Sequence, residues 1–268
     1  MRNQLHSPAG LAALLLVASA LSSYLASAQT IDSSQDSFLS DCQNAWSVNP
    51  LGWTAGGNCL DASYITCDTA GMIIEITMES VTLGGPLPDS IGDLAQLTHL
   101  QLKYNGLTGT IPASISLLTN LVYLAINGNN ITGIIPPSIG NLAALSHLSF
   151  YTTHLSGSIP PSIGNLTNLA NLGLTTNQMS GTIPTTIGAM TSLQVIQIMT
   201  NSISGPIPES ISNLQHLYYL GLIVTKLKGS IPSSIGNLRN LRSVYLDRNE
   251  LSGPIPPSLS DLTNLQSL

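Results

Sequence analysis

The chain has 268 residues, of which 43% are hydrophobic and only 7% are charged, and its formal net charge is -6. No Asp, Glu, Lys or Arg occurs from Tyr104 through Pro208. A protein that neutralises a phosphate backbone needs a continuous stripe of basic side chains, so this distribution argues against nucleic-acid binding. Beyond the first thirty or so residues no segment is apolar and long enough to span a bilayer, and we expect no membrane segment there.

The N-terminus has the organisation of a secretory signal peptide. Arg2 supplies a positive charge, residues 11–21 form a short apolar stretch, and small residues follow at Ala26 and Ala28. This order of positive region, apolar region and small-residue cleavage site predicts a signal peptide over residues 1–28. We therefore expect a mature protein that is secreted, or displayed at the cell surface.

Export places the cysteines in an oxidising compartment, where thiols pair. The chain has three of them, at Cys42, Cys59 and Cys67. Cys59 and Cys67 would close a short loop and are the favoured pair, which leaves Cys42 free or paired with another chain. Pairing of Cys42 with Cys59 is the alternative.

The rest of the chain consists mainly of sequence repeats. Proline recurs every 24 residues from Pro88 to Pro256, and a glycine stands three residues before each of these prolines, as Gly109 stands before Pro112. Such regular spacing without an insertion indicates a tandem repeat. One unit of this size cannot bury its leucines alone, so successive units must stack to form a continuous core.

Each repeat contains one short strand. Leu100 and Leu102 alternate with His99, Gln101 and Lys103, and this is the period of a strand that buries one face. Stacked strands in register form a parallel sheet, with neighbours ~4.8 Å apart. The following Ile-Pro-x-x-Ile-Gly run, as in residues 159–164, predicts a turn or short 3₁₀ helix on the opposite, convex side.

An asparagine follows the strand in most repeats. An amide side chain both donates and accepts hydrogen bonds, so we expect it to satisfy the backbone of the turn in the interior. Thr153 and Thr225 hold this position in two repeats, where a hydroxyl bonds less fully and looser packing is expected. The predicted asparagine ladder consists of Asn105, Asn129, Asn177, Asn201 and Asn249.

The repeated phrase Leu-x-x-Asn-x-Leu-Ser-Gly-x-Ile-Pro-x-x-Ile-Gly-Asn-Leu resembles the plant-specific class of leucine-rich repeat. That class occurs in receptor-like kinases, receptor-like proteins and polygalacturonase inhibitors. The resemblance implies an α/β repeat solenoid, a right-handed leucine-rich-repeat superhelix with a concave parallel β-sheet. It covers residues 72–268, which we divide into eight repeats and the start of a ninth.

The segment before the repeats, residues 29–71, resembles the N-terminal cap of this family. Trp53 and the Cys59/Cys67 pair stand in the expected places, but the tryptophan that such caps carry between their cysteines is missing. Its role can pass to Tyr64 or Trp46. No C-terminal cap follows the last repeat, so we expect the chain to be a fragment of a longer protein, and a membrane-anchored full-length form is compatible with it.

Catalytic and metal-binding motifs are absent from the sequence. No phosphate-binding loop, nucleophile elbow or His-Glu-x-x-His motif occurs, and His99 and His147 lie two repeats apart, ~10 Å by strand spacing, which is too far to share a metal ion. We therefore expect a protein that is not an enzyme and that holds no cofactor and no metal.

The outward positions of the strands remain as a binding surface. Tyrosine, histidine and amide side chains there suit recognition that is partly apolar and partly hydrogen-bonded. We predict that a peptide, glycan or protein ligand binds this concave face. The predicted contact residues are His99, Gln101, Tyr123, His147, Tyr151, Asn171, Gln197, Tyr219 and Tyr245.

Two N-glycosylation sequons, at Asn130 and Asn165, fall off the strand positions and would leave the concave face clear. A receptor-like ectodomain is the leading functional hypothesis. A secreted inhibitor of a cell-wall-degrading enzyme is one alternative. Ice binding or a structural surface role is another, based on a regular row of hydroxyls at Thr108, Thr132, Ser156, Ser180 and Ser204.

Overall fold

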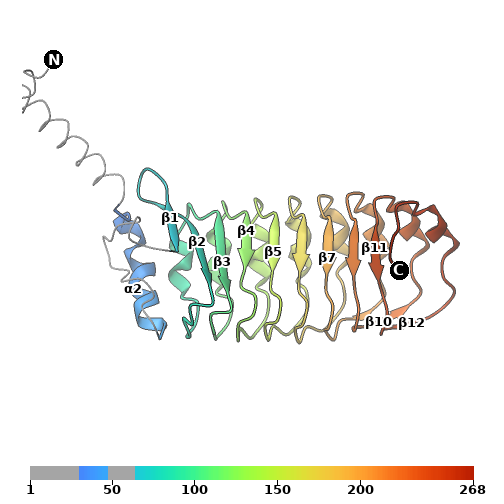
Figure 1. Ribbon diagram of the computed structural model, residues 1–268, viewed down its shortest axis with the longest axis horizontal. Coiled ribbons are helices and arrows are strands. Elements are labelled where there is room, and N and C mark those ends of the chain that lie inside the picture. The colour runs from blue at the N-terminus through green and yellow to red at the C-terminus, as the bar shows by residue number, and fades with distance from the viewer. Residues whose placement is uncertain (1–29, 48–63) are drawn as a thin grey trace, which may run out of the picture.

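The computed structural model describes residues 30–47 and 64–268, which form an elongated solenoid with one strand per turn (Figure 1). Within these residues the strands make a nine-stranded sheet in the order β1-β2-β3-β4-β5-β6-β7-β9-β11. Only β1 runs antiparallel to its neighbour. The strands are β1 (Ile65–Cys67), β2 (Ile73–Glu79), β3 (His99–Lys103), β4 (Tyr123–Ala125), β5 (His147–Ser149), β6 (Asn171–Gly173), β7 (Val195–Gln197), β9 (Tyr219–Gly221) and β11 (Ser243–Tyr245).

The register of the sheet follows the sequence repeat. Leu100 pairs with Leu124, and Leu124 pairs with Leu148, so equivalent residues of successive repeats lie side by side. Side chains alternate along each strand, and these leucines therefore all point to the same side of the sheet. The predicted parallel sheet and its single buried face are confirmed.

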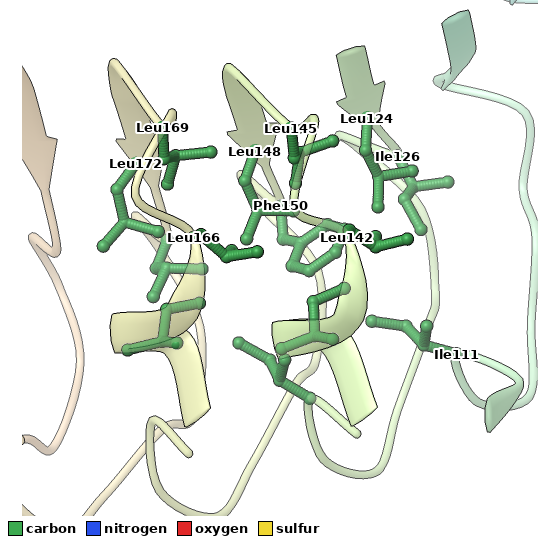
Figure 2. Close-up of a cluster of buried hydrophobic side chains, with 14 of the residues drawn as sticks. Ile111, Leu124, Ile126, Leu142, Leu145, Leu148, Phe150, Leu166, Leu169 and Leu172 are labelled. Carbon is green, nitrogen blue, oxygen red and sulfur yellow. The ribbon is translucent and has the colours of Figure 1, made fainter. Parts of the chain in front are cut away.

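The core is a column of aliphatic layers, one per repeat. Leu124, Leu148 and Leu172 stack along the axis, and Phe150 and Leu166 close the layer beneath them (Figure 2). All five are fully buried. Because burial of apolar surface contributes about 25 cal/mol for each Å² removed from water, this repeated column is the main source of stability.

Short 3₁₀ helices form the convex side. Each begins directly after a proline, such as Pro112 with φ -66° and ψ 141°. All but the last place an isoleucine such as Ile115 in the core, and the last carries Leu259 instead. The predicted 3₁₀ segments are confirmed. They are η2 (Asp89–Asp93), η3 (Ala113–Leu117), η4 (Pro137–Asn141), η5 (Pro161–Asn165), η6 (Thr185–Ala189), η7 (Glu209–Asn213), η8 (Ser233–Asn237) and η9 (Pro257–Asp261).

A second, three-stranded parallel sheet lies between the concave and convex sides near the C-terminal end. It contains β8 (Ser204–Gly205), β10 (Lys226–Gly229) and β12 (Glu250–Leu251). Isolated bridges such as the one between Thr110 and Thr132 continue the same pairing in earlier repeats. No strand was predicted from the sequence at these residues.

The asparagine ladder links each turn to the turn before it. Asn129 Oδ1 accepts hydrogen bonds from the backbone N–H groups of Asn105 and Leu107, both at 3.0 Å, and its Nδ2 donates to Leu102 O at 2.6 Å and Ile126 O at 2.9 Å. Asn129 is 2% exposed. The amide therefore satisfies backbone groups that have no access to water.

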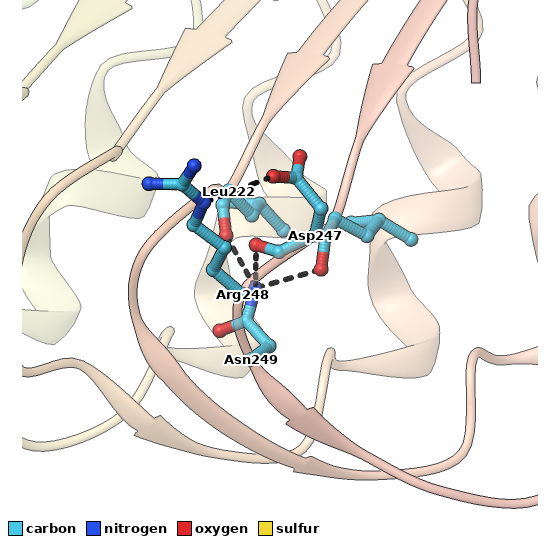
Figure 3. A network of polar contacts seen from close by, with 5 residues as sticks. Leu222, Asp247, Arg248 and Asn249 are labelled. Atoms are coloured by element: carbon cyan, nitrogen blue, oxygen red, sulfur yellow. Dashed lines mark hydrogen bonds and ion pairs between the residues drawn. The ribbon is translucent and has the colours of Figure 1, made fainter.

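The same arrangement recurs at the C-terminal end. Figure 3 shows Asn249, whose Nδ2 donates to Leu222 O at 2.7 Å, Leu246 O at 2.9 Å and Asp247 O at 3.4 Å. The neighbouring Asp247 and Arg248 form an exposed ion pair at 3.8 Å. The ladder predicted from the sequence is thus present at both ends of the solenoid.

A helical cap closes the N-terminal end of the core. The helix α2 (Asp36–Ala45), preceded by η1 (Ser33–Gln35), buries Phe38, Leu39 and Cys42 against the first repeat. Gln35 is fully buried, and its Oε1 accepts a hydrogen bond from Ile73 N at 2.8 Å. Trp46 is also buried and donates from Nε1 to Pro86 O at 2.9 Å.

Several predictions fall outside the described residues. These are the signal peptide over 1–28, Trp53 and Cys59. Cys67 is disulfide-bonded, and its pairing with Cys59 stays a prediction because Cys59 lies outside the described residues. Cys42 is a free, buried cysteine, so the alternative pair of Cys42 with Cys59 is wrong. Burial raises the pKa of the Cys42 thiol, and the nearby Asp41 carboxylate raises it further. Within residues 30–47 and 64–268, none of the helices combines the length and apolar character that crossing a bilayer requires.

Replacement of Asn129 by Ala should destabilise the solenoid strongly. The five backbone groups that bond to its amide would lose this partner, at roughly 1–3 kcal/mol for each group that is left buried with no other partner. We expect the free energy of unfolding in urea to fall by about 3 kcal/mol. The exposed Asn120, which donates one hydrogen bond to Ala95 O, is the matched control, and Asn120→Ala should cost less than about 1 kcal/mol.

Thr153→Asn should strengthen the ladder at one of its two threonine positions. Thr153 Oγ1 donates to Asn177 Oδ1 at 2.5 Å, whereas the ladder asparagines also reach a carbonyl of the preceding turn, as Asn129 reaches Leu102 O. We expect a gain of about 1 kcal/mol in the same urea measurement, from the added hydrogen bonds. Thr119→Asn, on the exposed convex side, should leave stability unchanged; a loss at position 153 would mean that the turn has no room for the amide.

Candidate functional site

The sheet brings all the predicted contact residues to its solvent side, which we call the concave face. His99, Tyr123, His147 and Asn171 are register partners on β3, β4, β5 and β6, and the same row continues through Tyr219 on β9. His99 is exposed and the others are partly exposed. Equivalent positions of the repeat therefore form one continuous row along the axis.

Three rings of this row are stacked. The centroids of Tyr123 and His147 lie 4.4 Å apart with their planes at 7°, and those of His99 and Tyr123 lie 6.1 Å apart at 18°. The stacking direction follows the solenoid axis because the rings stand on adjacent strands. Their faces are thus turned toward one another. His99 Nδ1 also lies 2.9 Å from the hydroxyl oxygen of Thr98.

The side chain of Tyr151, two residues after the end of β5, extends across the concave face toward β7. A Cβ built at Gly173 would lie 2.3 Å from Tyr151 Cε1, so the ring passes directly over this glycine. At its far end the Tyr151 hydroxyl donates a hydrogen bond to Gln197 Oε1 on β7. Burial raises the pKa of the Tyr151 phenol, and Tyr219 and Tyr123 raise it further.

Gly173 and Gly221 lie beneath side chains of the concave face, and neither was among the residues predicted from the sequence. Met199 Sδ lies 3.2 Å from a Cβ built at Gly221, so this glycine too lies beneath a large side chain. Glycine is unfavourable within a strand unless another group approaches the backbone closely. A glycine at a strand position of the repeat was therefore the feature of the sequence that could have identified these two sites.

Two polar residues on the solvent side of the sheet, Asn127 and Ser149, are buried and hydrogen-bonded. Asn127 Oδ1 accepts hydrogen bonds from Ser149 Oγ and from Tyr151 N, both at 2.8 Å. Asn127 is 8% exposed and Ser149 is 1% exposed. These two residues hold neighbouring turns together beneath the rings instead of meeting a ligand.

Charge is confined to the two ends of the concave face. Glu75, Glu79 and Lys103 occupy β2 and β3, and Asp247 lies beyond β11. Between them, histidine is the only side chain that titrates near neutral pH. Burial lowers the pKa of His147, and the Lys103 ammonium lowers it further.

Residues away from the concave face have other surroundings. Asn130 and Asn165, the predicted glycosylation sites, are both exposed and lie outside the nine strands. Within the hydroxyl row, Thr132, Ser156 and Ser204 each donate to a glycine carbonyl of the preceding turn, at 3.0 to 3.2 Å. In the described part of the chain no three His, Cys, Asp or Glu side chains are grouped so that they could hold a metal ion.

Comparison with known proteins finds repeat families and plant receptors. The family described as "Leucine-rich repeat region" matches residues 80–179, and the one described as "Leucine Rich Repeat" matches residues 240–262. The chain is similar to the receptor protein kinase WSS1 of Oryza sativa subsp. japonica, with 42% identity over 66 residues, which are 24% of this chain and 7% of that protein.

Solved structures of plant leucine-rich-repeat proteins are also similar to this chain. The leucine-rich-repeat ectodomain of the Arabidopsis receptor kinase HAESA was solved in complex with an N-terminally extended IDA peptide hormone ligand. It is 32% identical to this chain with a TM-score of 0.66, over 87% of this chain and 44% of that chain. A plant ice-binding protein has a TM-score of 0.62 over 89% of this chain and 95% of that chain, but its identity of 23% shows a shared fold alone. The chain thus spans less than half the length of both receptors.

The pKa of His147 offers a direct test of the electrostatics of the face. Lys103→Gln should raise it toward its usual value of 6.5 but not fully, because burial, the larger cause, remains. An NMR titration of the imidazole Cε1–H resonance measures this shift, and Lys226→Gln on the second sheet should not change it. Since the folded-state pKa is lowered, the stability linked to His147 is present in full above about pH 6.5 and decreases as the pH falls through the folded-state pKa.

Proposed function

Because this chain is a leucine-rich-repeat protein of the plant extracellular type, we propose that it is an extracellular recognition module that binds an extended peptide segment across its concave face. The module acts by binding and carries out no catalysis. Its place is outside the cell or at the cell surface, in agreement with the signal peptide predicted over residues 1–28. The exposed Asn130 and Asn165 would carry glycans away from the binding face.

One observation supports this proposal above the others: the stacked row of His99, Tyr123 and His147 on the solvent side of the sheet. The core needs none of these side chains, because the opposite face of the same strands already supplies Leu100, Leu124 and Leu148. Rigid rings give a large contact area at little cost in conformational entropy, and their hydroxyl and imidazole groups supply hydrogen bonds.

The orientation of the rings favours a peptide over a glycan. Sugars pack their apolar faces onto open aromatic faces, and here both faces of Tyr123 and one face of each histidine are covered by a neighbouring ring. An extended peptide instead presents backbone N–H and C=O groups, which the hydroxyl and imidazole groups of the row can bind through hydrogen bonds. The receptor ectodomain to which the chain is similar was solved with a peptide hormone, which supports the same class of ligand.

A selection from a random peptide library tests the proposal. Peptides of about twelve residues are long enough to cross the face, since an extended chain advances about 3.3 Å per residue. We expect the immobilised protein to enrich a consensus peptide, and the triple variant Tyr123→Ala/Tyr151→Ala/Tyr219→Ala to bind it about 100-fold more weakly, as for aromatic hot spots. Isothermal calorimetry with the synthetic consensus peptide measures the change.

The matched control is Leu117→Ser/Ile134→Ser, which removes exposed apolar side chains from the convex and lateral surfaces. It should leave affinity unchanged, and circular dichroism should show that both variants fold. Equal affinity of the triple variant and the original protein would refute the concave assignment, whereas enrichment of no peptide would refute peptide binding itself. Enzyme inhibition and ice binding stay predictions of the sequence, with no residue of the concave face in their favour.

A further inference from the structure

Two regions of the concave face, which we call the two ends of the binding site, differ in chemistry. The first is an acidic end at β2. Glu75 and Glu79 both point to solvent from this strand, and Glu75 Oε1 accepts a hydrogen bond from Thr77 Oγ1 at 3.0 Å. Across the sheet their register partners are His99 and Lys103. Two carboxylates thus face a single ammonium, and this end carries a net negative charge at neutral pH.

An apolar patch lies further along, over β7 and β9. It consists of Val195 and Tyr219, which are register partners, together with Met199 and Ile223, and all four are partly exposed. Met199 lies over Gly221, in the middle of the patch. The core side of the same strands is already filled by buried residues such as Ile196 and Leu220, so packing does not account for apolar side chains here.

The surface between these ends has no fixed charge. It contains the stacked rings of Tyr123 and His147, the Tyr151 ring over Gly173, and Gln197. No Asp, Glu, Lys or Arg occurs in the sequence from Tyr104 through Pro208. A ligand that spans the face therefore meets carboxylates, then a neutral hydrogen-bonding row, then an apolar patch.

The sheet sets the distance between the two ends. Six strand-to-strand steps separate β2 from β9 in the order β2-β3-β4-β5-β6-β7-β9. At ~4.8 Å per step this amounts to about 29 Å along the axis. An extended peptide advances about 3.3 to 3.6 Å per residue, so about eight or nine residues cover this distance.

We propose that the peptide ligand carries a cationic nitrogen that binds Glu75 and Glu79, and an apolar side chain, about eight residues away, that binds the patch of Val195, Met199, Tyr219 and Ile223. This inference rests on the proposed peptide-binding function and adds the chemistry and spacing of the ligand. A lysine or arginine side chain and a free N-terminal amine share the required charge. Complementary charge fixes the direction of the peptide on the face and rejects acidic partners at β2.

The experiment uses the same library selection followed by synthetic peptides. We expect the consensus to have a cationic group, either a basic side chain or a free N-terminus. A large aliphatic or aromatic residue should follow or precede this group by about eight residues. Peptides with a free and an acetylated N-terminus distinguish the two sources of positive charge. A consensus with no cationic group, or with no fixed spacing to an apolar residue, would overturn the inference.

Two pairs of variants then assign each end. Glu75→Gln/Glu79→Gln should weaken the consensus peptide about tenfold and reduce the salt dependence of binding, and Met199→Ser/Ile223→Ser should weaken it by a similar factor with the salt dependence unchanged. Glu209→Gln and Leu117→Ser are the matched controls on other surfaces, with no expected effect. Loss of binding in the controls, or a salt dependence that all variants share, contradicts the assignment.

A double-mutant cycle separates contact from folding. Replacing the basic residue of the peptide by Ala, or acetylating its N-terminus where that is the charge, should cost about tenfold with the original protein and almost nothing with Glu75→Gln/Glu79→Gln. Additive losses would mean that the carboxylates do not touch the cation. A further outcome is that peptides bind and require Tyr123, Tyr151 and Tyr219 while the variants at both ends bind them with unchanged affinity. In that outcome this inference fails and the proposed function stands.

Discussion

Each turn of this solenoid can satisfy its buried backbone only by bonding to the turns beside it. Asn129 illustrates the constraint, because its amide joins backbone groups of two successive turns at distances of 2.6 to 3.0 Å. Deviation from the repeat length would move the amide away from all of its partners at once. The strict 24-residue period from Pro88 to Pro256 follows from this requirement as much as from the stacking of leucines.

The same constraint divides the residues of each strand into two groups. Leu100, Leu124 and Leu148 must be apolar and similar in size, because each packs against its equivalents in the neighbouring turns. Residues on the other side of the strand meet solvent, and only their neighbours in the sheet limit them. Diversity in a chain of near-identical repeats is therefore concentrated on one face, which is where a binding surface can be built.

Much of the architecture could be predicted from the sequence because it depends on local periodicity. The strands, the 3₁₀ helices and the asparagine ladder follow from the positions of leucine, proline and asparagine within one repeat. The second sheet could not be predicted in this way, because its short strands, such as Ser204–Gly205, have no alternating apolar pattern and pair through backbone groups alone.

The candidate site was only partly predictable for a related reason. The 24-residue period of the sequence places His99, Tyr123 and His147 in one row, and the structure adds that their rings stack. Contacts between different positions of the repeat do not follow from periodicity. The crossing of Gly173 by Tyr151, and the burial of Asn127 by its bonds to Ser149 and Tyr151, depend on rotamers that three neighbouring turns set together.

Rigidity connects these features to binding. An extended peptide loses much conformational freedom when it is ordered on a surface, and affinity depends on how little the surface itself must also lose. Here the rings are already held: Tyr123 between two imidazoles, and Tyr151 by Gln197 at its tip and Gly173 beneath its ring. Those contacts are made before any ligand arrives, so the glycines and amides that sequence reasoning passes over contribute to recognition by fixing the groups that touch the ligand.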